Sequence, residues 1–79
     1  MIRFLCEMSD TGHYRLHQLD AENTDNLRAV LVQYMHENGV TFDILSEGVD
    51  DYGVALITIK DEDDKVSTYY LDTDYGVSK

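Results

Sequence analysis

The chain has 79 residues, of which 16 are acidic and 6 basic, so its formal net charge is −10 at pH 7. About 80 residues lie near the lower limit for an independent hydrophobic core, and we expect residues 1–79 to form one small domain. The acidic excess argues against direct nucleic-acid binding, which needs clustered Lys and Arg, and the lack of an apolar run of about 18 residues argues against a membrane span.

The first 19 residues predict a β-hairpin. Apolar side chains occupy every second position of the opening stretch, a period typical of a strand with one buried face. That face is predicted to hold Ile2, Phe4, Cys6 and Met8. Arg3 and Glu7 would point to the other side, and the Ser-Asp-Thr-Gly sequence of residues 9–12 favours a turn. We therefore expect paired strands at residues 2–8 and 13–19.

A helix is predicted at residues 25–38. Its apolar residues are spaced by three and four positions, which gives one buried stripe. The stripe consists of Leu27, Val30, Leu31, Tyr34 and Met35. Thr24 is the expected N-cap and Asp25 adds negative charge to the first turn, where the helix dipole favours it. Gly39 is expected just after the C-cap, a position that requires positive φ.

Three more strands are predicted in the second half of the chain. Residues 40–45 alternate, with Val40, Phe42 and Ile44 inward, and the apolar run at residues 54–59 is typical of a central strand. The last strand is expected at residues 66–71, with a loop at 47–53, an acidic connection at 60–65 and a loosely held tail from residue 72. The order ββ-α-βββ predicts an α+β domain in which a single helix packs on one face of a mainly antiparallel sheet.

No cofactor, metal or catalytic site is indicated. His13 and His17 would lie roughly 13 Å apart on a strand, too far to share an ion. Cys6 is expected to be a buried thiol and not a nucleophile, and a single cysteine fits a reducing cytoplasm. The acidic runs match no calcium-binding loop, although weak cation binding at residues 61–64 stays open, and the chain has no phosphate-binding or nucleophile-elbow motif. We therefore expect a protein without enzymatic activity.

Charge is concentrated in the second half of the chain. Residues 1–39 hold 6 acids and 3 bases, whereas residues 40–79 hold 10 acids and 3 bases. Tyrosines, which are frequent interface residues, are interleaved with these acids. We predict acidic groups at both ends of the sheet, with the 47–53 loop and the tail at one end and residues 60–65 at the other. The exposed positions of the last strands and Asp43 are predicted to join them into a stripe. The predicted partner-binding residues are Glu47, Asp50, Asp51, Tyr52, Asp61, Glu62, Asp63, Asp64, Asp72, Asp74 and Tyr75.

In its size, its Asp-rich charge, its lone helix on a sheet and its lack of catalytic motifs, the chain resembles the small acidic phage-type inhibitors that act as DNA mimics, among them anti-restriction and anti-CRISPR proteins. The resemblance is to the class and matches no family motif. It implies a non-catalytic inhibitor that occupies the basic nucleic-acid-binding site of a target such as a bacterial defence effector in the host cytoplasm. Two alternatives predict the same surface: an immunity protein or antitoxin that neutralises a basic nuclease, and an interaction module whose acids serve only solubility. The sequence does not indicate the oligomeric state.

Overall fold

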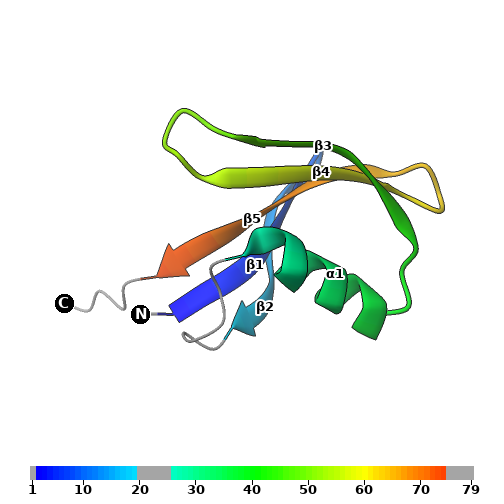
Figure 1. The fold of residues 1–79 in the computed structure, drawn as a ribbon, viewed down its shortest axis with the longest axis horizontal. Helices are drawn as coiled ribbons and strands as arrows, with labels where there is room; N and C mark the ends of the chain where they lie inside the picture. The colour runs from blue at the N-terminus through cyan, green and yellow to red at the C-terminus, as the bar shows by residue number, and fades with distance from the viewer. Residues whose placement is uncertain (1, 20–25, 75–79) are drawn as a thin grey trace.

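The computed structural model describes residues 2–19 and 26–74, which form one helix and five strands (Figure 1). The elements are β1 (Ile2–Ser9), β2 (Gly12–Leu19), α1 (Leu27–Glu37), β3 (Phe42–Val49), β4 (Ala55–Asp61) and β5 (Val66–Asp74). Every strand pair is antiparallel, so the predicted α+β class, single helix and order of elements are confirmed. Within these residues no helix is long and apolar enough to cross a membrane.

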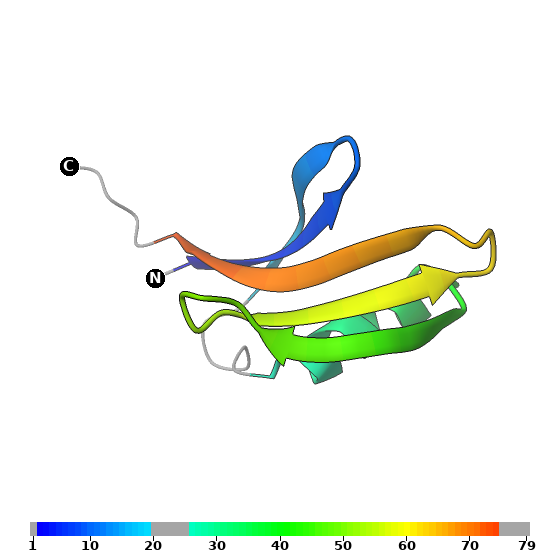
Figure 2. The same ribbon diagram turned by 90° about the horizontal axis from the view of Figure 1, so that it is seen from above.

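The first and last strands lie side by side in the middle of the sheet. The strand order is β2-β1-β5-β4-β3, so β2 and β3 are the two edges. Because α1 follows one edge strand and precedes the other, it crosses the sheet and packs against β1, β5 and β4 on one face (Figure 1). In Figure 2 the helix lies behind β3 and β4, so the view is onto the opposite face, which we call the open face because no described element covers it.

The N-terminus of α1 differs from the prediction by two residues. Asn26 is the N-cap, and its side-chain oxygen accepts a hydrogen bond from the backbone N–H of Ala29 at 3.2 Å. Asn is as good a cap as Thr, which is why composition alone could not choose between them. The predicted cap Thr24 and the predicted first-turn acid Asp25 lie outside the described residues.

The C-terminus of α1 is the one predicted. Gly39 has a φ of +67°, in the left-handed region that favours glycine. Its N–H donates to the carbonyl of His36, and the N–H of Val40 donates to the carbonyl of Met35. These two bonds form a Schellman motif, which satisfies the last carbonyls of the helix and turns the chain toward β3.

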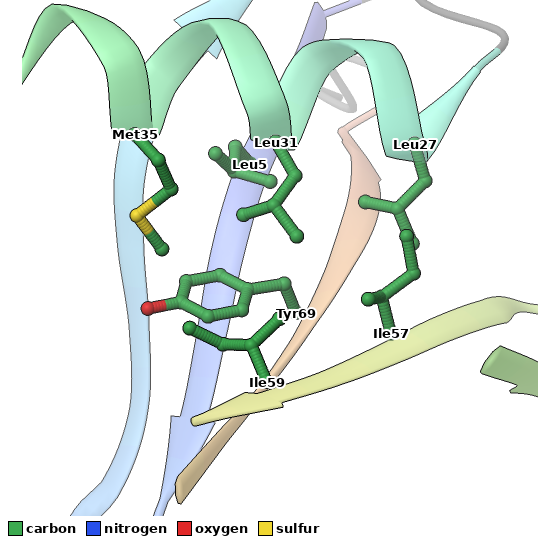
Figure 3. Close-up of a cluster of buried hydrophobic side chains, with 7 residues drawn as sticks. All are labelled: Leu5, Leu27, Leu31, Met35, Ile57, Ile59 and Tyr69. Carbon is green, nitrogen blue, oxygen red and sulfur yellow. The ribbon is translucent and has the colours of Figure 1, made fainter. Parts of the chain in front are cut away.

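The hydrophobic core lies between α1 and the sheet. Figure 3 shows three helix side chains, Leu27, Leu31 and Met35, that point toward side chains of β1, β4 and β5. The sheet contributes Leu5, Ile57, Ile59 and Tyr69. Around this cluster pack the partly buried side chains of Leu16, Val30, Tyr34, Val40, Phe42, Ile44 and Leu71. The helical stripe and the inward positions predicted at residues 40–44 are thereby confirmed.

The prediction of which side of β1 faces the core is wrong. Leu5 is the residue that enters the core beneath the helix, and Glu7 lies on the same side, where it accepts a hydrogen bond from the core residue Tyr69. Phe4, Cys6 and Met8, predicted to face the core, are paired across β1 and β5 with the open-face residues of β5. Cys6 is nevertheless buried, although no helix or strand that the structure describes covers the open face. The alternation identified a strand but could not say which face the helix covers.

All three strands of the second half end later than predicted, and β4 reaches Asp61, which the sequence placed in the acidic connection. Glu47, placed in a loop by the sequence, lies within β3, which extends to Val49. Asp72 and Asp74, placed in a loose tail, lie within β5, where they pair with β1 residues Phe4 and Ile2. The extension of β5 depends on β1, a partner distant in sequence whose pairing overrides local composition, whereas the extension of β3 continues its hairpin with β4 up to the turn.

Candidate functional site

Apart from Asp43 and Glu47 of β3, the acidic residues of the second half lie at the two ends of the sheet. Hairpin geometry places the β3–β4 turn and the last residues of β5 at one end. The β4–β5 turn lies at the other end, where Asp64 and Lys65 line a hollow together with Asp10 of the β1–β2 turn. This is the arrangement expected from the sequence. The seven residues of β4 correspond to a distance of about 23 Å between the two turns.

Two of the predicted partner-binding acids organise turns. Asp50 Oδ1 and Asp61 Oδ1 each accept two hydrogen bonds, from the backbone N–H groups two and four residues later, at N···O distances of 2.8–3.0 Å. The fourth residue of each turn has positive φ, +82° at Gly53 and +62° at Asp64. Both hairpins therefore use a type I turn closed by a left-handed residue, with an aspartate in the first position. The aspartates have a structural role whatever their part in binding.

Replacing Asp61 tests this structural role. We expect Asp61→Ala to lower the free energy of unfolding by about 1–2 kcal/mol, because two backbone donors lose their acceptor. Asp61→Asn removes the same negative charge but keeps an oxygen that can accept both bonds, so its loss should be much smaller. Urea unfolding of the two variants measures the difference. Equal losses would contradict the role of the Oδ1 atom.

The left-handed residue of the second turn offers a stabilising substitution. Asp64 has a Cβ in a conformation that glycine adopts without strain, so Asp64→Gly should raise the free energy of unfolding by about 0.5–1 kcal/mol. The variant also removes an exposed ion pair with Lys60, at 3.2 Å, which contributes little. Asp63→Gly is the control, because Asp63 lacks the positive φ and should give no gain. Thermal unfolding of both variants measures whether Asp64→Gly is stabilised and Asp63→Gly is not.

Among the predicted acids whose side chains the structure describes, Glu47, Asp64 and Asp72 are paired with bases. Glu47 projects to the helix side of β3, where Arg28 of α1 lies 3.7 Å away. Asp72 on β5 is bound by Arg15 of β2 at 3.2 Å. Together with the Asp64 pair, these contacts reduce the charge that the acids present to a partner. They belong to exposed or half-exposed side chains, so a competing basic partner could replace them at little cost.

The remaining predicted site residues differ in how much they project. Tyr52 is 92% exposed at the tip of the β3–β4 hairpin, and Asp51 beside it is exposed as well. At the other end Asp63 is exposed, and Glu62 accepts a hydrogen bond from the N–H of Thr41 at 3.3 Å. The side chain of Asp74 and the whole of Tyr75 lie outside what the structure describes.

Few acids lie between the two ends of the sheet, where the sequence predicted an acidic stripe. On β3, Asp43 lies opposite Lys60, and Glu47 is the acid paired with α1. The sequences of β4 and β5 between the ends, residues 55–60 and 66–71, contain no acid. The described acids therefore form two end groups joined along one sheet edge by partly neutralised residues, not an even row.

The open face has a groove that the sequence analysis missed. It has a volume of about 530 Å³, and its lining includes the apolar side chains of Met8, Val54 and Leu56. Tyr70, Asp50 and Asp72 also line the groove. A signal was present in the almost wholly apolar run at residues 54–59. Its alternate side chains must lie on opposite faces, so half of them lie away from the helix.

Side chains from β2 and β5 meet at the margin of this groove. His13 Nδ1 lies 3.2 Å from the Tyr70 hydroxyl, and the two rings are in edge-to-face contact. Arg15, which binds Asp72, also stacks over the ring of Phe4 at 4.4 Å from its centroid. The open face thus holds one guanidinium of its own between an aromatic ring and a carboxylate.

The two histidines of β2 lie on opposite faces of the sheet. An irregularity opposite Leu5 and Cys6 leaves Leu16 as an extra residue, so that His17 pairs with Leu5 on the helix side. There its ring contacts Tyr34 of α1, at 5.9 Å between centroids. In the described part of the chain no group of three His, Cys, Asp or Glu side chains is placed to hold a metal ion.

Cys6 is buried beneath the open face. Burial raises the pKa of its thiol above the usual value, and the negative charge of Asp72 raises it further. A thiol with a raised pKa is a poor nucleophile at neutral pH because the thiolate is the reactive form. The environment is that of an inert structural cysteine.

These features define an α+β domain with two acidic ends, an exposed tyrosine directly after two adjacent acids and a groove on the open face of its sheet. No known protein family, characterised protein or solved structure gives a significant match to the chain.

Proposed function

We propose that the protein is a non-catalytic binding protein whose acidic surface occupies the basic nucleic-acid-binding site of another protein. The observation that carries the proposal is the projection of Asp51 and Tyr52 from one end of the sheet and of Asp63 from the other, on turns fixed by internal hydrogen bonds. Carboxylates held in fixed positions lose little entropy on binding, and complementary charge accelerates association.

Ten net negative charges on so small a domain support a use for the charge beyond solubility. The usual magnitude for a small domain is about 2–8, and self-repulsion lowers the stability of the compact state. The tyrosine at the hairpin tip adds an apolar contact with a polar end, which is typical of protein interfaces. The proposed target is a bacterial nucleic-acid-binding protein such as a defence effector, with a basic nuclease toxin as the second candidate, since both present the same charge.

The test compares two variants with the same change in net charge. Asp51→Lys with Asp63→Lys reverses one exposed acid at each end and keeps the turn aspartates Asp50 and Asp61. The matched control places the same charge on the outer face of α1 by Ala29→Lys, Gln33→Lys and Glu37→Lys, all exposed positions. Each protein is immobilised, exposed to a nuclease-treated bacterial lysate, and eluted with salt or with duplex DNA.

We expect the wild type and the helix variant to retain a nucleic-acid-binding protein that duplex DNA displaces, and the end-reversed variant to lose it. Binding through carboxylates should also weaken as salt rises. Retention by the end-reversed variant, or a retained protein that DNA does not displace, would refute the proposal. The identity of the retained protein then separates a defence effector from a toxin.

A further inference from the structure

The groove on the open face combines three features that together favour a positively charged side chain. Its floor is apolar, its wall includes the ring of Tyr70, and a carboxylate lies at each of two positions on its lining, Asp50 and Asp72. Arginine and lysine have long apolar stems with a charge at the tip, so they bind best where an apolar surface ends at a carboxylate. A neutral apolar ligand would partly desolvate the Asp50 carboxylate without supplying a cation for it.

The same face already binds a guanidinium in the way the groove could bind another. Arg15 lies over the ring of Phe4, at 4.4 Å from its centroid, and reaches Asp72 at 3.2 Å. The groove offers the same two elements further along the sheet, with Tyr70 of β5 as the aromatic ring and Asp50, just after β3, as the carboxylate.

Asp50 keeps one oxygen for such a ligand. Its Oδ1 atom accepts the two backbone bonds of the turn, which fixes the position of the carboxylate. In the described part of the chain Asp50 forms no ion pair, whereas Asp72 is bound by Arg15. A carboxylate that is half-buried, fixed and without a basic neighbour gains more from a cation than a mobile exposed one.

We propose that this groove binds an arginine side chain presented by the basic partner, with the arginine stem on Met8 and Leu56, the guanidinium against Tyr70 and its charge paired with Asp50. This inference rests on the proposed function, because it takes the partner to be basic, and it names the contact that would give the interface its specificity. The groove, of about 530 Å³, has room for one arginine and its neighbouring backbone.

A peptide titration tests the proposal directly. The probe is a short glycine peptide with two arginines, and its control is the same peptide with citrulline, which has the shape of arginine without the charge. Backbone NMR signals of the full chain are followed during the titration. We expect the arginine peptide to shift the signals of Met8, Leu56 and Tyr70 in a saturable way, and the citrulline peptide to leave them nearly unchanged. Equal shifts with both peptides would show a merely apolar groove and overturn the proposal.

Two substitutions locate the contact. Asp50→Asn keeps the turn acceptor and should weaken binding of the arginine peptide about tenfold, whereas Asp51→Asn, with the same charge change outside the groove, should weaken it less than about twofold. Leu56→Lys should abolish binding by filling the groove with a competing cation, and Val66→Lys is its control on the same face. Each variant is first shown to unfold at a temperature close to that of the wild type. Equal effects of the two Asp→Asn variants would show a diffuse attraction instead.

Two further outcomes keep this inference distinct from the proposed function. If Asp50→Asn and Leu56→Lys still retain the DNA-displaceable protein as well as the wild type does, the groove proposal fails and the acidic ends remain the binding surface. If the arginine peptide binds in the groove but no nucleic-acid-binding protein is retained, the proposed function fails. Sedimentation of the wild type as a dimer that Leu56→Lys dissociates would also overturn the groove proposal, because a second copy would then cover the groove.

Discussion

Leu31→Ala is expected to lower the free energy of unfolding by about 2–5 kcal/mol, a large part of the total stability of a domain this small. Leu31 has no exposed surface and lies in the middle of the stripe that α1 turns toward the sheet (Figure 3). The loss has two parts. The removed methyl groups no longer contribute the free energy of transfer from water to the core, and a cavity is left among Leu5, Ile59 and Tyr69. These residues belong to paired strands, which cannot move together to close it.

The control for this variant is the next residue of the helix. Val32 is 46% exposed, so Val32→Ala should change the free energy of unfolding by well under about 1 kcal/mol. Chemical denaturation of both variants gives the comparison. A small loss for Leu31→Ala would mean that the helix does not close the core as described.

The second large effect is a loss of stability in alkali that depends on Tyr69. This side chain is 5% exposed, and its hydroxyl donates to Glu7 Oε2 at 2.7 Å. Burial raises the pKa of Tyr69 well above its usual value, and the hydrogen bond to the Glu7 carboxylate raises it further. Below about pH 10 tyrosine keeps its proton in the folded and the unfolded chain, so this contribution to stability is fully present there.

Above that pH the unfolded chain releases the proton while the folded chain retains it. The free energy of unfolding should therefore fall by about 1.4 kcal/mol for each pH unit, or about 2–3 kcal/mol between pH 10 and 12. Tyr69→Phe cannot ionise and should lack this part of the decline, although it starts lower by about 1–3 kcal/mol because Glu7 loses its donor.

Tyr70→Phe is the matched control for this experiment. Burial also raises the pKa of Tyr70, followed by the nearby Cys6, but Tyr70 is only half-buried on the open face. Its substitution should therefore remove a smaller part of the alkaline decline. Urea unfolding across the alkaline range measures all three proteins. If the wild type and Tyr69→Phe lost stability with the same slope, the protonated tyrosine would not be the cause.

The pair Tyr69 and Tyr70 shows how far the sequence could predict the fold. Adjacent strand residues point to opposite faces, so one tyrosine had to leave the core. Which one does so depends on how β5 pairs with β1 and β4, and that register involves partners more than 60 positions away for β1. The same limit explains the error in β1, where alternation was clear but did not indicate which of its two faces the helix covers. Local features, such as the helical stripe and the glycine after α1, were predictable because their causes lie within a few residues.

The sequence could predict which residues belong to the candidate site, but only part of their arrangement in space. The placement of acids at both ends of the sheet follows from the order of the hairpins alone, and the structure places acids at both ends. The turn roles of Asp50 and Asp61 could have been suspected, since aspartate at the first position of a short turn commonly accepts backbone bonds. The pairing of Glu47 with Arg28, and of Asp72 with Arg15, could not, because it joins elements by tertiary packing. The open-face groove depends in the same way on the curvature of the assembled sheet.

The central pairing of β1 with β5 has a consequence for how the molecule assembles. The hairpin β1–β2 and the meander β3–β4–β5 each contain only neighbouring strands, so each can form early from local contacts. Their union must wait until residues 68–74 reach residues 2–8, which closes a loop of nearly the whole chain. During synthesis on the ribosome, the amino-terminal hairpin therefore keeps an unpaired edge until the last strand has emerged, and a chain shortened before β5 would lack the strand that joins β1 to β4 in one sheet.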